Sequence, residues 1–254
     1  MPEFIRLAED EGLFELTLNR PPLNILHGPM MAELSRAFEV VAEHRDVKLL
    51  LIRAEGKAFS AGADIDEHRP DKVHGMIAQF HGIFRVLERV PFPTVAFVHG
   101  AALGGGCELA LGCDMIVATE RAKFGQPEVG LGFLPPVAAA ILPARVGWSR
   151  AVEICCGGQA LKAQEAFAAG LVNHVFTADV ADEALHAFLA PFLRQSPTTL
   201  RLIKKALRGG GQRAFLDRLE VAERVFLDEL MTTDDVLEGL AAFAEKREPT
   251  WKNR

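Results

Sequence analysis

The chain lacks any run of about 20 apolar residues free of charges, turns or glycine breaks, which excludes an evident transmembrane helix. Residues 1–19 have neither the basic stretch nor the apolar run of a signal peptide, so we expect a globular protein in the cytoplasm, without a membrane partner. Only four cysteines are present, at positions 107, 113, 155 and 156, and their spacing matches no disulfide framework. We expect them to be reduced and buried.

A basic surface is also missing. The 28 lysines and arginines are outnumbered by 34 aspartates and glutamates, giving a net charge of −6, and no basic block or aromatic-basic stripe occurs. This balance argues against nucleic acid as a partner. With 254 residues, 49% of them apolar, the chain is long enough for one large domain, or for one domain with an appendage.

The apolar pattern predicts an α/β protein. Residues 4–8 and 13–19 flank Glu-Asp-Glu-Gly and predict a hairpin, after which helices and buried strands alternate. The expected helices are 30–44, 73–89 and 105–111, and the expected strands are 47–52, 94–98, 115–118 and 171–176. Two or three short helices are expected within 143–169, and helices 213–230 and 234–246 near the end. We therefore expect a core of residues 1–195 and a helical region of residues 196–254.

A glycine-rich turn leads into the expected helix that carries Glu108. The free N–H groups at such a helix start carry partial positive charge and can stabilise a developing anion. Glu108 is the only carboxyl group between His99 and Asp114, and its place in the first turn favours the ionised form, which could hold or activate a water. The alternative is ordinary packing, with a glutamate that caps its helix.

Glu128 has the opposite setting, because it is the only ionisable residue between Lys123 and Arg145. Apolar surroundings raise the pKa of a carboxyl group and prepare it as a proton donor near neutral pH. The alternative is a surface turn whose glutamate faces water. Two carboxyl groups in unlike environments suit paired acid and base roles.

Two other combinations are weaker. Ser60 and His99 could form a nucleophile and base, but no elbow motif surrounds Ser60 and nothing orients the histidine, so a hydrolase is a poor second. His68, His74 and His81 invite a metal site, since His74 and His81 are seven residues apart on an expected helix. No third ligand has a suitable spacing to this pair, and we expect no metal.

The motifs taken together resemble the crotonase, or enoyl-CoA hydratase/isomerase, superfamily. The matching segments are Asn19-Arg20-Pro21, Phe59-Ser-Ala-Gly-Ala-Asp64, Gly104-Gly-Gly-Cys-Glu108, Gly125-Gln-Pro-Glu128 and Phe243-Ala-Glu-Lys246-Arg, and they span almost the whole chain. The resemblance implies a spiral of repeated strand-strand-helix units with a C-terminal helical trimerisation region. It also implies a homotrimer or a dimer of trimers.

The resemblance further implies a site for an acyl-CoA thioester that needs no cofactor, because coenzyme A is part of the substrate. It places the catalytic glutamates at Glu108 and Glu128 and the two oxyanion N–H groups at Ala63 and Gly105. It assigns CoA binding to Ala61, Gly62, Ile65, Phe243 and Lys246, and the acyl pocket to Phe133, Pro135, Pro136 and Val137.

With both glutamates present, the resemblance implies an enoyl-CoA hydratase. Glu108 would orient and deprotonate the water, and Glu128 would supply the proton to carbon. An isomerase or a C–C hydrolase of the same superfamily is the alternative, and a non-catalytic scaffold would be expected to lose one of the acids. Asp64 is expected to have a structural role beside the oxyanion turn.

The sequence departs from the family pattern in two places. Residues 19–24 are one residue shorter than usual, near the part that binds adenine. After Glu128, Leu-Pro-Pro-Val-Ala-Ala at 134–139 replaces a stretch that is usually glycine-rich, and this change must reshape the acyl pocket. This variant, with Asp66-Glu-His68 and Phe80-His81, resembles cyclohexa-1,5-diene-1-carbonyl-CoA hydratases. We therefore expect a compact cyclic acyl group to be preferred over a long chain.

Overall fold

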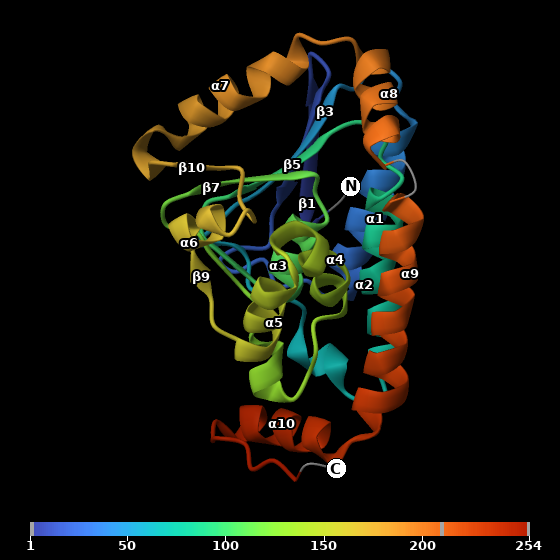
Figure 1. Cartoon of the computed structure of the whole chain (residues 1–254), viewed down its shortest axis with the longest axis vertical. Helices are drawn as coiled ribbons and strands as arrows, with labels where there is room; N and C mark the ends of the chain where they lie inside the picture. Colours follow the sequence, from blue (N-terminus) through green and yellow to red (C-terminus); the bar gives the residue numbers. More distant parts are fainter. Residues whose placement is uncertain (1–2, 209–210, 253–254) are drawn as a thin grey trace.

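The computed structural model describes residues 3–208 and 211–252 and shows two sheets surrounded by helices (Figure 1). The larger sheet has the strand order β1-β2-β3-β5-β7-β10 and the smaller one β4-β6-β8-β9. The strands of the larger sheet are β1 (Ile5–Asp10), β2 (Leu13–Leu18), β3 (Leu49–Ala54), β5 (Thr94–Val98), β7 (Met115–Thr119) and β10 (His174–Phe176). Those of the smaller sheet are β4 (Ala58–Ser60), β6 (Ala101–Leu103), β8 (Lys123–Gly125) and β9 (Leu161–Lys162).

The same unit recurs along the chain. Strands β3, β5 and β7 pair in parallel in the larger sheet, and each is followed by a short strand, β4, β6 or β8, that pairs in parallel in the smaller sheet. Helix α2 (Val73–Leu87) follows the first pair and α3 (Gly105–Leu111) the second. This repetition of strand, strand and helix confirms the expected fold class.

The short strands are the part that the sequence pattern did not predict. β4, β6 and β8 have three residues each, which is too few to show an alternation of apolar and polar positions. The last strand of the larger sheet is also shorter than expected. Only His174–Phe176 pairs with β7, because the N–H groups of Leu171 and Val172 bond to the Ala166 carbonyl at the end of the preceding helix.

Strand β3 is covered on both faces, as its continuous apolar run predicted. Leu50 and Ile52 belong to the main core, into which α1 (Gly28–Glu43) and α2 also pack. Leu49 and Leu51 point to the opposite face and pack against α7 (Ala181–Leu193). Successive side chains of a strand point to opposite faces, so this one run serves two cores.

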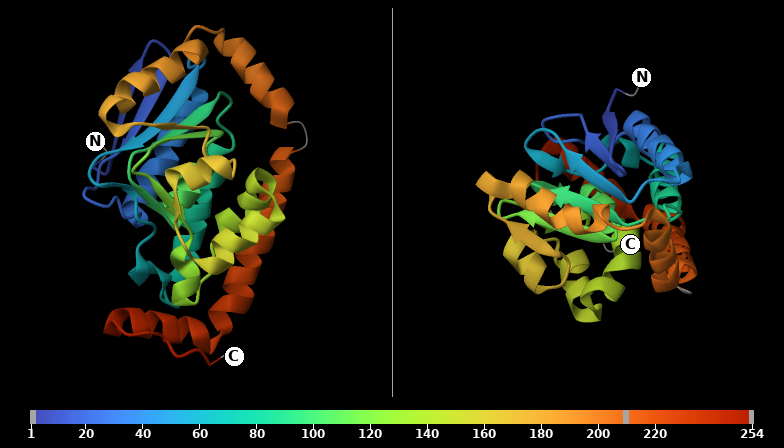
Figure 2. Two further views of the ribbon diagram at one scale, coloured as in Figure 1. Left: turned by 60° about the vertical axis from the view of Figure 1, so that its left-hand side comes forward. Right: turned by 90° about the horizontal axis from the view of Figure 1, so that it is seen from above.

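The remaining helices are α4 (Pro136–Val146), α5 (Trp148–Gly157), α6 (Ala163–Ala168), α8 (Pro197–Arg208), α9 (Gly211–Arg224) and α10 (Asp234–Glu245). Helix α9 descends along the side of the molecule and leads to α10, which lies across its base (Figure 2). Leu219 and Phe226 belong to the main core, so the C-terminal helices are packed on it. The boundary predicted after residue 195 falls between α7 and α8 and stays a prediction.

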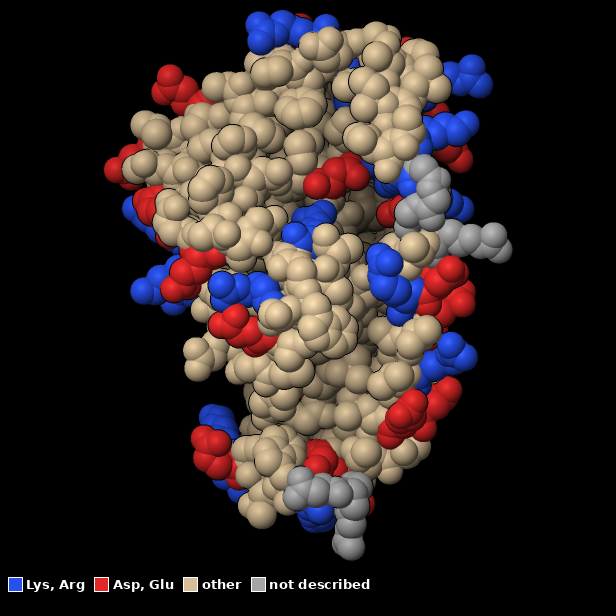
Figure 3. Space-filling model, in the orientation of Figure 1, with Lys and Arg blue, Asp and Glu red and all other residues tan. Residues whose placement is uncertain are grey.

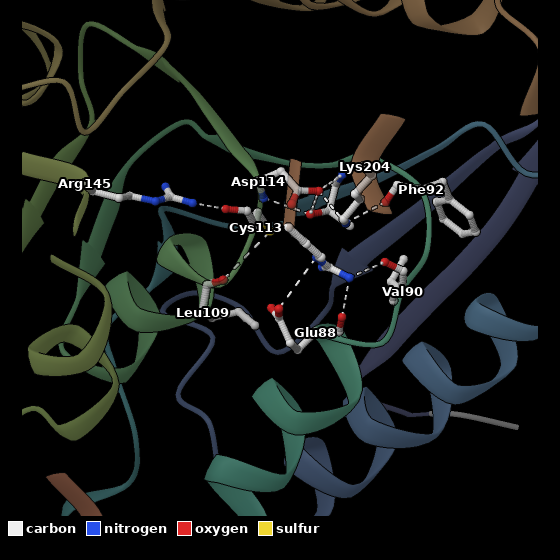
Figure 4. Close-up of polar contacts among 10 residues, drawn as sticks. Glu88, Val90, Phe92, Leu109, Cys113, Asp114, Arg145 and Lys204 are labelled. Carbon is white, nitrogen blue, oxygen red and sulfur yellow. Dashed lines mark hydrogen bonds and ion pairs between the residues drawn. The ribbon is translucent and has the colours of Figure 1, made fainter. Parts of the chain in front are cut away.

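Helix α8 is tied to the core by polar contacts of the buried Lys204 side chain (Figure 4). The Lys204 ammonium lies 2.5 Å from Asp114 Oδ2 and donates to the Phe92 carbonyl at 2.8 Å. The same carboxylate oxygen accepts from the backbone N–H of Thr94 at 2.8 Å. Burial lowers the pKa of Lys204, although the Asp114 carboxylate opposes this. The contact joins α8 to the start of β7.

The surface carries mixed charge. In the face shown in Figure 3, lysine and arginine side chains are interspersed with aspartate and glutamate.

All four cysteines are free, but Cys156 is exposed and Cys155 is half-buried near the end of α5, so the expectation that all four are buried was wrong. Within residues 3–208 and 211–252, no helix has the length and apolar content needed to cross a membrane.

Candidate active site

The turn between β6 and α3 presents a backbone N–H group. Gly104 has φ +52°, a conformation that glycine adopts without strain, and it reverses the chain into α3. Gly105 is the first residue of that helix, so its N–H has no intrahelical acceptor. Gly106 packs so closely on Ser60 that a side chain there would overlap the Ser60 carbonyl. The close packing brings the start of α3 against the end of β4.

A second N–H group comes from Ala63, just beyond β4. Leu26 and Ala63 form an isolated parallel bridge, in which Leu26 donates to the Gly62 carbonyl at 2.9 Å and accepts from the Asp64 N–H at 3.0 Å. These bonds use the Gly62 carbonyl and the Asp64 N–H, which flank Ala63. The N–H of Ala63 itself therefore points away from Leu26. A Cβ placed on Gly105 would lie 3.2 Å from the Ala63 nitrogen. The two expected oxyanion donors are therefore neighbours.

Glu108 is buried on α3, with 2% of its surface exposed. Its Oε1 accepts the N–H of Ala138 at 2.8 Å, in the first turn of α4. Burial raises the pKa of Glu108 well above the usual carboxyl range, and the N–H groups of Ala138 and Val137 only partly oppose this. The expectation that its own helix start keeps Glu108 ionised was wrong in direction, because burial outweighs the field of a seven-residue helix.

Glu128 lies in the 3₁₀ helix η2 (Pro127–Leu131) and is half-buried. Its Oε1 is 2.5 Å from the position that a Cβ on Gly104 would take. The buried Gln126 amide, turned so that its nitrogen faces the carboxylate, donates to both oxygens at 3.3 and 3.2 Å. Burial raises the pKa of Glu128, and the negative charge of Glu108 raises it further. The expected upward direction of this pKa is confirmed. Glu128 is thus not a solvent-facing turn residue.

Both acids face one pocket of about 690 Å³, part of which is open to solvent. The N–H-bearing residues Ala63 and Gly105 line it as well. Among the other residues assigned from the sequence, those that line it are Ala61, Gly62, Ile65, Phe133, Pro135 and Pro136. Val137 does not reach this pocket and is fully buried behind its wall. Pro136 also begins α4, so this segment both starts a helix and lines the pocket.

Several lining residues were not predicted. Met76, Ile77 and Phe80 come from α2, and Phe226 comes from the π-helical segment Val225–Glu229 after α9. Their apolar spacing is that of any core-facing helix, so the sequence held no signal that distinguishes pocket from core. Gln126 was part of a quoted motif, but its contact with Glu128 could be found only in the structure.

The remaining candidates lie elsewhere. Neither Phe243 nor Lys246 lines this pocket. Phe243 is 50% exposed on α10, and Lys246 follows that helix with φ +54°. Their contact with CoA on a neighbouring subunit stays a prediction. Ser60 donates to the Asn24 carbonyl at 2.7 Å, while His99 contacts the Gly56 carbonyl at 3.1 Å. The two are therefore not arranged as a nucleophile and its base.

Asp64 has the structural role that was expected. Its carboxylate accepts the Asp66 N–H at 3.1 Å and caps the 3₁₀ helix η1 (Ile65–His68). Of the three histidines that invited a metal site, His74 is exposed, and His81 is buried with its Nδ1 2.6 Å from Glu223 Oε2. His68 lines the pocket described above.

Known proteins resemble the chain over nearly its full length. A family model described as enoyl-CoA hydratase/isomerase matches residues 8–254. The cyclohexa-1,5-dienecarbonyl-CoA hydratase of Thauera aromatica is 36% identical over 253 residues, which cover 100% of this chain and 98% of that protein. A crystal structure of an enoyl-CoA hydratase from Mycobacterium avium subsp. paratuberculosis matches with a TM-score of 0.88 at 30% identity and covers 99% of both chains. The chain therefore belongs to the enoyl-CoA hydratase/isomerase, or crotonase, family.

Proposed function

We propose that the protein adds water to the double bond of an α,β-unsaturated acyl-CoA thioester. The observation that carries the proposal is the convergence of two carboxyl groups of raised pKa, Glu108 and Glu128, on the pocket that Ala63 and Gly105 also line. Two acids with unequal proton affinity are what water addition needs, because one group takes a proton while the other gives one.

The N–H groups of Ala63 and Gly105 bind the thioester oxygen and stabilise the enolate that forms as water adds. Removing one such donor costs about 2.7–4 kcal/mol of transition-state stabilisation in comparable sites. The water oxygen bonds to the β-carbon and its proton passes to Glu108, while Glu128 gives its proton to the α-carbon. The Ala138 N–H on Glu108 and the added charge repulsion on Glu128 favour this order of proton affinity.

The acyl group that we propose is compact and cyclic, as in a cyclic dienoyl thioester. The Thauera aromatica relative is named for a cyclohexadiene substrate. Phe133, Pro135 and Pro136 form a stiff, apolar wall, since proline fixes its own φ and restricts the residue before it. A preorganised wall favours a rigid planar ring over a long flexible chain.

We further propose a homotrimer or dimer of trimers in the cytoplasm, with coenzyme A as part of the substrate and no separate cofactor. Helix α8 supports assembly through the C-terminal helices, because Leu202, Ile203 and Leu207 are 60, 51 and 83% exposed. Light scattering on purified protein tests the oligomeric state.

The activity is tested by following the loss of enoyl-thioester absorbance with straight, branched and cyclic enoyl-CoA substrates. We expect hydration, with a higher kcat/KM for a cyclic dienoyl-CoA than for a long straight-chain enoyl-CoA. Product analysis separates hydration from the alternatives, since an isomerase moves the double bond without adding water and a C–C hydrolase shortens the acyl skeleton. Absence of a hydrated product from all three classes would refute the proposal.

A further inference from the structure

His68 is the one polar side chain, apart from the two glutamates, among the described residues that line the pocket. It is the last residue of η1, and its ring packs on Phe133 with the centroids 5.1 Å apart. Phe133 in turn stacks on Phe226 at 6.0 Å with an angle of 15° between the rings. The imidazole is therefore held in place within an otherwise apolar wall.

The hydrogen bond of His68 determines which of its nitrogens carries a proton. Nδ1 lies 2.9 Å from the carbonyl oxygen of Asp64, and a carbonyl can only accept, so Nδ1 is the donor. Burial lowers the pKa of His68, which keeps the ring neutral at neutral pH. In a neutral ring with the proton on Nδ1, Nε2 is a hydrogen-bond acceptor.

Among the residues that the structure describes, Nε2 has no hydrogen-bond partner, and it is not one of the fully buried unpaired atoms, so a ligand or water can reach it. The side chains that line the pocket with His68, other than the two acids, are apolar and cannot donate to it. A polar atom left unpaired in an apolar, ligand-filled pocket is destabilising, whereas a matched donor on the ligand satisfies it.

We propose that His68 is a specificity-determining residue whose Nε2 accepts a hydrogen bond from an O–H group on the acyl part of the thioester. That hydroxyl has two chemical sources: the one that water addition creates, or one that the acyl group already carries. The inference rests on the proposed function, because it takes this pocket as the one that holds the acyl group.

The test measures binding in a protein that cannot convert the ligands. In the Glu108→Gln/Glu128→Gln background, calorimetry compares cyclohexanecarbonyl-CoA with two hydroxylated analogues. One carries the hydroxyl on the ring carbon next to the thioester-bearing carbon, where water addition would place it, and the other carries it on the opposite carbon. The ratio of dissociation constants, bare ring to hydroxylated ring, cancels contributions from the CoA part.

With His68 present, we expect at least one hydroxylated analogue to bind about 3- to 10-fold tighter than the bare ring, as for one net hydrogen bond. His68→Leu should bring that ratio to about 1, and His68→Gln, which keeps an acceptor, should retain part of it. Loss of preference for the adjacent hydroxyl identifies the product as the source, and loss for the opposite hydroxyl identifies the acyl group.

A ratio of about 1 for both analogues with His68 present, or a preference unchanged in His68→Leu, would overturn the inference. Thermal unfolding confirms that each variant is folded. Because the readout is binding rather than turnover, it fails independently of the proposed function: absence of hydration by the unsubstituted enzyme leaves the binding ratio intact.

Discussion

The carboxylate of Glu128 occupies the space that a side chain on Gly104 would need. Its Oε1 lies 2.5 Å from the position of a Cβ on that glycine, and Gly104 itself has φ +52°. The glycine therefore does two things at once. It makes the turn that exposes the N–H of Gly105, and it leaves room for the acid beside that N–H.

Substitution of that glycine disturbs both roles, so a second glycine with positive φ serves as the control for backbone strain. Gly104→Ala should lower kcat/KM by at least ~10-fold, because the methyl group displaces Glu128 from its position relative to the substrate. The strained backbone also lowers the free energy of unfolding by about 1–3 kcal/mol. Gly147→Ala is the matched control, since Gly147 has φ +77° and no neighbouring atom within 4 Å. Full activity in Gly104→Ala would contradict this account of the turn.

Burial of Glu108 should reduce its own contribution to the free energy of unfolding as pH rises. Its pKa is raised from the ordinary value of 4.5 to about 7 in the folded state. Between these two pH values the folded state therefore binds more protons than the unfolded state. The contribution of Glu108 to stability is therefore highest at acid pH and is lost as pH rises through that window. Glu108→Gln mimics the protonated form and should raise the free energy of unfolding on the order of 2 kcal/mol at pH 8, but little at pH 5. Urea unfolding at both pH values measures this, and an equal difference at the two would count against it.

Most residues that the motifs singled out line one pocket, and they could be named because the motifs are local. Glu108 and Glu128 each sit beside a glycine turn, and Ala63 lies within the Phe59–Asp64 motif, so short stretches of sequence carried the signal. The pKa of Glu108 could not be predicted in direction, since it depends on burial under α4. Phe226 reaches the pocket from the far end of the chain through a π-helical segment, which apolar spacing does not reveal.

The contact between Lys204 and Asp114 should matter for stability and not for chemistry. Asp114→Asn keeps an oxygen for the Thr94 N–H but leaves the ammonium of Lys204, 6% exposed, without its counter-charge. Because Asp114 is itself one-third exposed, we expect a loss of about 2 kcal/mol in the free energy of unfolding, less than for a fully buried pair. Adding Lys204→Met should recover most of it, with kcat unchanged throughout. Equal stability of Asp114→Asn and the unsubstituted enzyme would show that the pair contributes nothing.

Substitution of Lys246 tests the proposed contact of this residue with CoA bound to a neighbouring subunit. Its side chain is exposed beyond α10, and an ammonium there suits a ligand phosphate. Lys246→Ala should raise KM for the thioester several-fold with little change in kcat, and the effect should shrink as salt is added. Lys252→Ala, which removes another exposed lysine near the C-terminal end, is the control. A KM that stays the same at every salt concentration would remove Lys246 from the CoA site.

We propose that Glu108 and Glu128 act together on water, and steady-state hydration by Glu108→Gln and by Glu128→Gln measures whether both acids are needed. The substrate is the enoyl-CoA that the unsubstituted enzyme hydrates fastest, and the dissociation constant of a saturated acyl-CoA is measured in parallel. We expect each substitution to lower kcat by at least ~10²-fold while the dissociation constant of the saturated acyl-CoA changes little. Turnover at the rate of the unsubstituted enzyme in either variant would contradict it.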